Sequence, residues 1–274
     1  MSTKQTQKTK RCCSAVLIGM LLAALSAGCS NPAGGNGGGS GTPPEAPFVE
    51  GGASLILSPD KLNIKVTVTT SDGAPVIVEG CNETELTSGT ETTLHAKDIL
   101  VILKGKITEL NCRINQLTAL NVQGLTALQG LNCWSNRLTA LNVQGLTALQ
   151  TLYCAENQLT ALNVQGLTAL RWLNCGGNQL AALNVQGCTA LKDLRCFGNR
   201  LTADVFKTLF DNLPVREEGD DAKCYLYIEE IGVPEGNHTN FTVPPDLAAA
   251  FTDAKNNKKW KMYKCRGIFN CVEI

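Results

Sequence analysis

Residues 117–137 read LTALNVQGLTALQGLNCWSNR, and three further blocks of the same length follow with few changes. The blocks begin at Leu138, Leu159 and Leu180, where the chain reads LTALNVQGLTAL, LTALNVQGLTAL and LAALNVQGCTAL. Three residue types keep the 21-residue step through five units: leucine at Leu110, Leu131, Leu152, Leu173 and Leu194, cysteine at Cys112, Cys133, Cys154, Cys175 and Cys196, and asparagine at Asn115, Asn136, Asn157, Asn178 and Asn199. Such a fixed period is typical of solenoids, in which each unit buries its apolar side against the next.

The unit spells L-x-x-L-x-C-x-x-N-x-L, as in Leu128, Leu131, Cys133, Asn136 and Leu138. This spacing is that of a leucine-rich repeat, whose period is about 20–29 residues. We therefore expect a leucine-rich-repeat solenoid with a short parallel concave sheet. Since the unit is too short for a long helix, the convex side should be extended or irregular. The repeated asparagine should satisfy backbone groups that the bend after the strand leaves unpaired.

The refrain after the asparagine should line the core from the convex side, through Leu138, Leu141, Val143 and Leu146. Tandem units of this length, with cysteine in the strand and a nested half-repeat, resemble the short bacterial leucine-rich repeats of treponemal surface proteins and BspA-like proteins. The resemblance covers residues 99–203. It implies a surface-associated protein that attaches to host proteins or to other bacteria.

Both flanks of the repeats (107–203) are expected to be caps, because a solenoid exposes an apolar cross-section at its ends. Residues 48–106 predict a β-rich N-terminal cap, since apolar Leu62, Ile64, Val66 and Val68 alternate with polar residues. Further strands are expected at 76–78, 92–96 and 99–104.

Residues 204–274 predict an α/β C-terminal cap. Asp204 stands where the repeat has a leucine, and we expect it to N-cap a helix that Pro214 ends. The apolar face of this helix comprises Val205, Phe206, Leu209, Phe210 and Leu213. A strand at 224–228, a helix from Pro245 to about Asn256 and a last strand at 260–265 should follow.

The N-terminus has the pattern of an export signal. Basic residues at positions 4–11 precede an apolar run from Ala15 to Ala27, which is too short for an ordinary membrane span. The ending LSAGC resembles the lipobox of bacterial lipoproteins, which implies a signal peptide at 1–28 and lipidation of Cys29. Ser26 stands where the usual box has leucine, as in the relaxed boxes of spirochaetes. Residues 29–47 should be a flexible Gly/Pro linker, and ordinary secretion with a free Cys29 is the alternative.

Charge excludes one class of partner. The chain has 24 basic and 24 acidic residues, and removing residues 1–28 leaves 20 basic against 24 acidic, a net charge of −4. No long basic run remains, so the electrostatic footprint of a nucleic-acid-binding protein is absent. The N-terminal lipid is then the expected membrane contact, with the outer membrane or cell surface as the expected location.

Thirteen cysteines in an exported chain invite a disulfide framework. The five ladder cysteines, however, stand where most leucine-rich repeats have an inward leucine, and Cys188 replaces a leucine of the refrain. Cysteine that exchanges with leucine behaves as a small buried hydrophobe, so we expect inert thiols. One disulfide is expected among Cys224, Cys265 and Cys271, in a pairing that the sequence leaves open, and Cys81 has no obvious partner.

No cofactor and no metal are expected. The cysteines lack C-x-x-C spacing and flanking histidines, which argues against a zinc site. The acidic loop at 217–221 lacks the ligand spacing of a calcium loop, so we expect it to be solvated. The two histidines, His95 and His238, lie in different caps without a catalytic motif.

The units differ at the strand positions that should face the concave side. A purely structural role would have kept one residue type there, as it did for leucine, cysteine and asparagine. These positions predict a ligand-binding face, because Trp, Tyr and Arg are enriched in binding hot spots. A solvated face with incidental aromatic residues is the alternative. The predicted binding residues are Arg113, Trp134, Tyr153, Arg171, Trp172, Arg195 and Phe197, with Asn111, Asn132 and Asn174 as polar contacts.

Together these patterns predict a lipid-anchored envelope protein that binds another macromolecule through its concave face. An attachment role toward a host or a neighbouring bacterium is the main hypothesis, and the partner is a protein or a glycan. The alternatives are a scaffold that faces the periplasm and, less favoured, an enzyme with a site in the caps.

Overall fold

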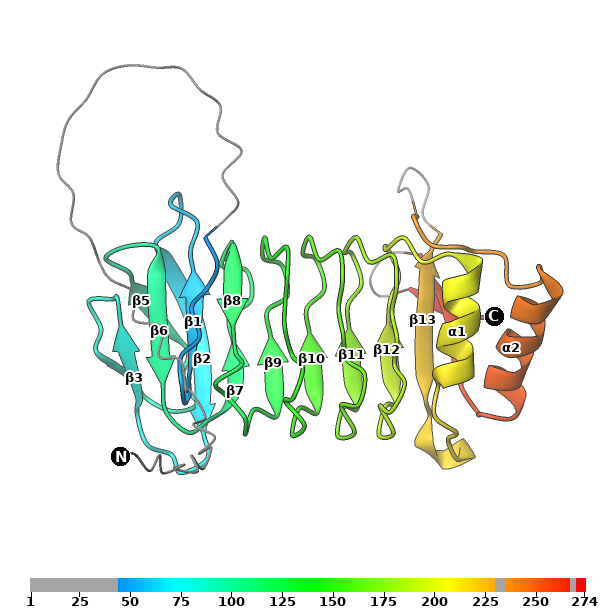
Figure 1. The fold of residues 1–274 in the computed structure, drawn as a ribbon, viewed down its shortest axis with the longest axis horizontal. Helices are drawn as coiled ribbons and strands as arrows, with labels where there is room; N and C mark the ends of the chain where they lie inside the picture. The colour runs from blue at the N-terminus through cyan, green and yellow to red at the C-terminus, as the bar shows by residue number, and fades with distance from the viewer. Residues whose placement is uncertain (1–43, 230–234, 267–269) are drawn as a thin grey trace, which may run out of the picture. The chain divides into compact units, whose positions relative to one another are not determined.

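The computed structural model describes residues 44–229, 235–266 and 270–274. Its main feature is a ten-stranded sheet that runs along the repeats, in the order β15-β14-β13-β12-β11-β10-β9-β7-β2-β5 (Figure 1). The pairs from β7 to β14 are parallel, which confirms the expected parallel sheet. The strands are β2 (Asn63–Thr70), β5 (Thr92–His95), β7 (Ile107–Asn111), β9 (Gly130–Asn132), β10 (Thr151–Tyr153), β11 (Trp172–Asn174), β12 (Asp193–Arg195), β13 (Lys223–Ile228), β14 (Lys261–Cys265) and β15 (Cys271–Glu273).

The register of this sheet follows from the 21-residue period. Leu131 pairs with Leu152, Leu152 with Leu173 and Leu173 with Leu194, so equivalent residues of successive units lie side by side. Because side chains alternate between the two faces of a strand, the leucine and the cysteine two positions later both point inward. These leucines and all five ladder cysteines are at most 1% exposed.

A second sheet lies at the N-terminal end, in the order β4-β3-β6-β1-β8. Its strands are β4 (Glu85–Leu86), β3 (Val76–Glu79), β6 (Leu100–Lys104), β1 (Gly52–Ile56) and β8 (Ala119–Asn121). The structure has β3, β5 and β6 in the segments 76–78, 92–96 and 99–104, where strands are predicted. The strand β1 was not predicted, because GASLI is buried along its whole length and therefore lacks polar alternation.

The first repeat is shared with the N-terminal region. In that repeat β8 pairs with β1, and β7 pairs with β2. The backbone hydrogen bonds of the first unit therefore join it to two strands of the N-terminal region. Residue 106, the predicted end of the N-terminal cap, is not a boundary between separately paired groups of strands.

The repeated asparagines form a hydrogen-bonded ladder through the solenoid. Asn157 is typical: its Nδ2 donates to the carbonyls of Cys133, Cys154 and Ala155 at 3.0, 3.1 and 3.2 Å, and its Oδ1 accepts from Leu138 N at 3.0 Å. Each such asparagine thus joins the backbone of its own unit to that of the unit before. The predicted role of the asparagine is confirmed.

Both ends of this asparagine ladder are closed by residues outside the repeats. At the first rung, Asn115 Nδ2 donates to the carbonyl of Lys65 in β2 at 2.7 Å. After the last repeat, Asn237 Nδ2 donates to the carbonyls of Cys196 and Leu226 at 2.9 Å, and its Oδ1 accepts from Leu201 N. Asn237 supplies a further rung although it does not keep the 21-residue step.

The convex side consists of turns and extended segments, as expected. Leu138, Leu141, Val143 and Leu146 are at most 6% exposed and line the core from that side. Glutamine side chains join neighbouring units on the surface, as where Gln144 Nε2 donates to the carbonyl of Asn163 at 2.8 Å.

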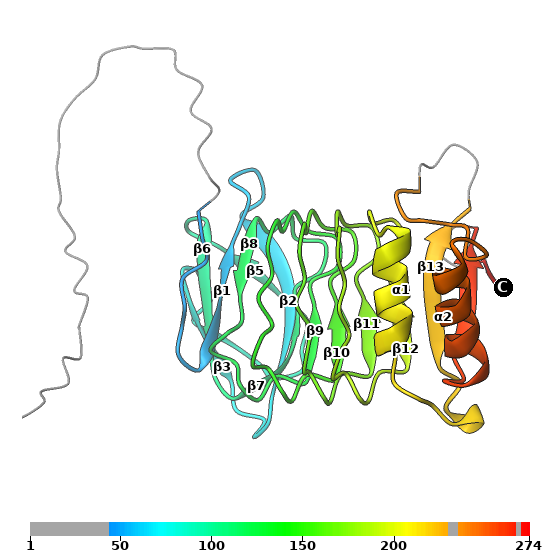
Figure 2. The ribbon, with the colours of Figure 1, turned by 45° about the vertical axis from the view of Figure 1, so that its right-hand side comes forward.

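After the repeats come α1 (Ala203–Asn212) and α2 (Pro245–Asn256), which contact each other at the C-terminal end of the long sheet (Figure 2). The second helix has the bounds that the sequence predicts. The predicted N-cap of the first is wrong: Thr202, rather than Asp204, has extended backbone and accepts from Val205 N, and Asp204 lies in the first turn. Phe206, Phe210 and Phe251 pack with other aromatic rings between the helices.

The last strands are held by a disulfide between Cys265 of β14 and Cys271 of β15. Cys224 remains a buried thiol, and so does Cys81. The sequence did not predict β15. The signal peptide, Cys29 and most of the linker lie outside the described residues. None of the described helices has the length and apolarity needed to cross a membrane.

Replacing Asn157 by alanine leaves the buried N–H of Leu138 without its acceptor. It also removes one of two donors from each of the carbonyls of Cys133, Cys154 and Ala155, which keep a hydrogen bond from another residue. Because unsatisfied buried groups are costly, we expect the free energy of unfolding to fall by about 3 kcal/mol. Urea denaturation followed by circular dichroism measures this change. Gln158→Ala, at an exposed side chain one residue on, is the control and should change stability by less than about 0.5 kcal/mol. Equal loss in both variants would contradict the role of the asparagine ladder.

The ladder thiols should be chemically silent in the folded protein. Burial raises the pKa of Cys133 to about 12 and holds that of Cys154 well above its ordinary value, while only the thiolate reacts. We expect iodoacetamide at pH 8 to leave both unmodified until urea is added, as read by peptide mass spectrometry. The exposed thiol of Thr147→Cys is the control and should react at once. Fast labelling of Cys154 in the native state would refute this expectation.

Candidate functional site: the exposed face of the long sheet

The outward side chains of the repeat strands form three rows. These rows, with the adjoining outward residues of β2, β13 and β14, are here called the sheet face. Each row takes one outward position from every unit, because inward leucine and cysteine occupy the positions between them. The first row is Glu109, Gly130, Thr151, Trp172 and Asp193, the second Asn111, Asn132, Tyr153, Asn174 and Arg195, and the third Arg113, Trp134, Ala155, Gly176 and Phe197.

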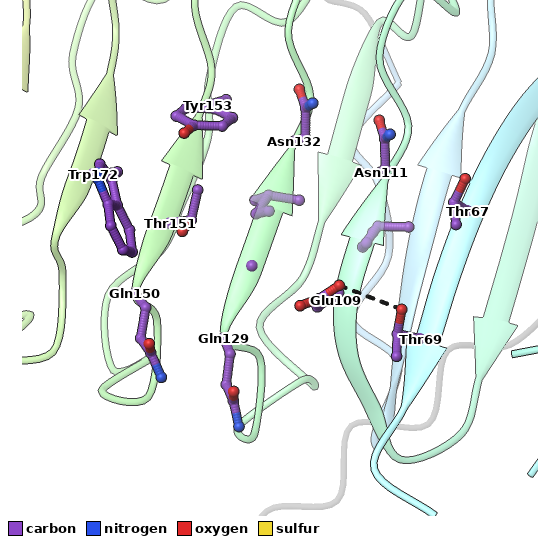
Figure 3. A pocket seen from close by; sticks show the side chains of 13 residues that line it. Thr67, Thr69, Glu109, Asn111, Gln129, Asn132, Gln150, Thr151, Tyr153 and Trp172 are labelled. Carbon is purple, nitrogen blue, oxygen red and sulfur yellow. Dashed lines mark hydrogen bonds between the residues drawn. The ribbon is translucent and has the colours of Figure 1, made fainter. Parts of the chain in front are cut away.

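The sheet face is hollowed in two adjoining places that share Asn132, Tyr153 and Trp172. The aromatic hollow, of about 610 Å³, is lined by those three residues and by Arg113, Trp134, Ala155, Glu156, Asn174, Asp193, Arg195 and Phe197. The amide hollow, of about 450 Å³, is lined by the shared residues and by Thr67, Thr69, Glu109, Asn111, Gln129, Gly130, Gln150 and Thr151, over Leu110 and Leu131 (Figure 3). Both volumes fall in the range of about 300–1,000 Å³ that is usual for ligand sites.

Eight of the ten predicted residues line the aromatic hollow, and Asn111 lines the amide hollow. Arg171 is the exception. It precedes β11, at the position that Gln129 and Gln150 occupy in other units, and it lines neither hollow. The expectation that Arg171 belongs with the other binding residues is therefore not met, although Gln129 and Gln150 line the amide hollow from the equivalent position.

Phe197 is placed differently from the prediction. Its side chain is only 8% exposed, and its ring lies against Gly176 of the preceding unit, where an added Cβ would come within 2.8 Å of Cε2. Tyr153 and Trp172, in contrast, are 38% and 40% exposed. Phe197 thus forms part of the wall of the aromatic hollow, whereas Tyr153 and Trp172 offer ring surface to a ligand.

In each of the three predicted asparagines, the side-chain oxygen Oδ1 forms a local hydrogen bond. The Oδ1 atoms of Asn111, Asn132 and Asn174 accept from the backbone N–H two residues on, at 3.2–3.3 Å. Within the described chain their Nδ2 groups form no hydrogen bond. These asparagines therefore present both N–H donors of Nδ2 to anything bound on the sheet face.

Arg195 is held rigidly at the edge of the aromatic hollow. Its Nε lies 3.1 Å from Asp193 Oδ1, and its guanidinium lies 4.7 Å above the centre of the Tyr225 ring. Burial alone would lower the pKa of Arg195, but the hydrogen bond and charge of Asp193 outweigh it and raise that pKa. The guanidinium is thus a fixed positive charge.

The sheet face continues beyond the repeats. Tyr225 of β13 and Tyr263 of β14 extend the row of Arg195, and their rings stack with centres 5.0 Å apart. Burial is the main cause that raises the pKa of both hydroxyls. The sequence pattern did not single out these tyrosines. The apolar Cys224 and Leu226 on either side of Tyr225 were a usable signal, because inward neighbours on a strand imply that Tyr225 points outward.

Glu156 is a further residue of the site that the sequence pattern did not single out. It lies beyond Ala155 at the rim of the aromatic hollow, with its carboxylate over Gly177. Burial raises its pKa, and it forms no ion pair with any described residue. The carboxylate is therefore a candidate partner for a cation or a hydrogen-bond donor of the ligand.

The described residues contain no cluster of three or more His, Cys, Asp or Glu side chains that could hold a metal ion. Neither histidine lines a hollow: His95 lies in β5 at the end of the long sheet, and His238 follows the repeats. His95 pairs with Glu83, whose pKa is lowered to about 2 by the backbone N–H and ring of His95, and His238 packs against Phe241.

No protein-family model and no curated protein matches the chain. Among solved structures it is similar to the functional domain of InlJ from Listeria monocytogenes, which includes a cysteine ladder, at 31% identity over 44% of this chain and 26% of that chain, with a TM-score of 0.38. It is also similar to an internalin, InlF, from Listeria monocytogenes, at 17% identity over 58% and 60% of the two chains, with a TM-score of 0.33. The chain thus spans about a quarter of the first and 60% of the second. These likenesses are too loose to transfer a role, so the chemistry of the sheet face is the basis for assigning a function.

Proposed function

We propose that this chain is a cell-envelope leucine-rich-repeat protein that binds a protein partner through the sheet face and acts in attachment. The observation that carries the proposal is where the units differ. They are nearly identical on the convex side, and their differences converge on two adjoining hollows. A surface with only a structural role has no reason to vary in this way.

The chemistry of the aromatic hollow suits a protein partner. Trp134, Tyr153 and Trp172 offer large rings with few rotatable bonds, and such residues dominate binding hot spots. The fixed charge of Arg195 and the carboxylate of Glu156, which pairs with no described cation, add polar groups of both signs at the rim. An apolar centre with a polar rim is the usual anatomy of a protein interface.

The rigidity of the scaffold favours binding by a preformed surface. The asparagine ladder and the parallel backbone bonds fix each unit against the next, so the rings need little ordering when the partner arrives. Preorganisation of this kind improves affinity because it lowers the entropy lost on association.

We further propose that Cys29 is lipidated after removal of residues 1–28, so that the chain is tethered to the bacterial membrane and displayed at the cell surface. The support comes from the sequence alone. Protease treatment of intact cells, with a periplasmic marker as control, separates the two placements: surface display predicts cleavage of the repeats in unbroken cells. Protection until the envelope is opened would favour a periplasmic scaffold with partners of the same cell.

An enzyme remains the less favoured alternative. It would need a site in the terminal regions, where the pairing of His95 with Glu83 is the one histidine–carboxylate pair among the described residues. No specific observation favours a reaction there. An activity abolished by His95→Ala would be needed to revive this alternative.

Replacing both Trp134 and Trp172 by alanine should remove the anchors of the aromatic hollow. We expect the affinity for the partner to fall by about thirtyfold or more, as for hot-spot residues. The probes are immobilised fibronectin, laminin and collagen, with binding of the full chain followed by surface plasmon resonance. Thr147→Ala with Thr168→Ala, on the convex side, is the matched control. Binding that survives in the tryptophan variant would refute the role of the sheet face.

A further inference from the structure

The amide hollow exists because one unit lacks a side chain. Gly130 stands where neighbouring units have Glu109, Thr151 and Trp172. The backbone does not require glycine here, since Gly130 is not in the left-handed region, and an added Cβ would meet Glu109 Cγ at an ordinary 3.5 Å. The effect of this glycine is therefore the space above β9.

The polar groups around that space are unused. Among the described residues, no hydrogen bond is formed by the side chains of Gln129, Gln150 and Thr151, or by Asn132 Nδ2. On the convex side, in contrast, glutamine amides are engaged, as where Gln144 donates to the carbonyl of Asn163. Figure 3 shows the two glutamines along one side of the hollow and the asparagines along the other. Each glutamine amide offers both donors and an acceptor.

The hollow also has an aromatic wall. Tyr153 and Trp172 lie together at one end of it, each more than a third exposed (Figure 3). The face of an aromatic ring is slightly negative because of its quadrupole. It therefore attracts the slightly positive C–H groups of an apolar ligand surface, in weak contacts that add up.

Charge narrows the choice of ligand. Glu109 is the one lining side chain that is charged at neutral pH, and its Oε2 already accepts from the Thr69 hydroxyl at 3.4 Å. No described lysine or arginine lines the hollow, so an anionic ligand has no counter-charge there. A basic peptide side chain would satisfy Glu109 alone and leave the amides and hydroxyls unpaired, which is costly.

We propose that the amide hollow is a subsite for a neutral saccharide, carried as a glycan by the macromolecule that the sheet face binds. A sugar ring has hydroxyls around its edge for the amides, and a C–H face for Tyr153 or Trp172. The inference rests on the proposed function, because the two hollows share these two rings. The partner is then a glycoprotein whose polypeptide contacts the aromatic hollow.

The test uses variants that separate the two hollows. Gly130→Trp fills the amide hollow, and Gln129→Ala with Gln150→Ala removes its free amides; none of these residues lines the aromatic hollow. Trp134→Ala changes the aromatic hollow alone. Urea denaturation of each variant checks that the fold is intact.

The full chain is applied to an array of neutral oligosaccharides that contain galactose, mannose, fucose or N-acetylglucosamine, together with sialylated forms and unglycosylated peptides. We expect neutral oligosaccharides to bind, and Gly130→Trp and the double glutamine variant each to weaken this binding about tenfold or more. Trp134→Ala should leave it unchanged. The proposal is overturned if no saccharide binds, or if only sialylated forms or peptides bind. It is also overturned if the Gly130→Trp variant binds neutral saccharides as well as the wild-type chain does.

The two proposals fail in different ways. If the tryptophan variant loses binding to matrix proteins and no saccharide binds on the array, the proposal of protein recognition stands and the saccharide subsite is rejected. If Gly130→Trp abolishes saccharide binding while matrix-protein binding does not change in Trp134→Ala, the saccharide subsite stands. The aromatic hollow is then rejected as the protein site. Enzymatic removal of glycans from the matrix proteins supplies a third readout, and should weaken binding of the wild-type chain but not of the Gly130→Trp variant.

Discussion

The hydrogen bonds of the buried asparagines are the interaction on which the solenoid depends. A tight bend follows every strand and leaves carbonyls inside the core, where water cannot reach them. One amide in each unit satisfies carbonyls of two successive units, as Asn157 does for Cys133 and Cys154. The same side chain therefore fixes the bend and the register between units. Asn115 and Asn237 extend this pattern into the terminal regions, so the ladder has no unsatisfied end among the described residues.

Because the interior and the convex side carry the stability, the sheet face is free to vary. Leucine, cysteine and asparagine occupy the inward positions in every unit, and the outward positions between them differ from strand to strand. The absence of a side chain matters as much as its presence there: Gly130 opens the amide hollow, and Gly176 lets Phe197 lie flat as a wall. A rigid, regular scaffold thus presents an irregular surface, which is what selective recognition requires.

Most of the repeat architecture could be predicted because the period dictates it. A step of 21 residues places Leu131 beside Leu152 and leaves no room for a convex helix. The flanking regions were harder, since they have no period to average over. The strand at 52–56 is buried throughout and gives no alternation, and the N-cap of the first helix is Thr202 because its backbone is extended while that of Asp204 is already helical. Arg171 was included in the site because the repeat step fixes its position but not whether its side chain lines a hollow, as those of Gln129 and Gln150 do.

The sequence by itself determined the solenoid, the inward leucine, cysteine and asparagine positions, and eight of the residues that gather in the aromatic hollow, because a repeat converts a sequence interval into a position in space. Only the tertiary structure decided the rest. It placed Tyr225 and Tyr263 in line with Arg195, set Glu156 at the rim of the aromatic hollow, and brought Asn237 into the ladder. The repeat step does not show that Glu156 reaches the hollow, because the equivalent residues Ser135, Gly177 and Gly198 are small. The other three residues depend on how the chain after the last unit folds back onto the sheet.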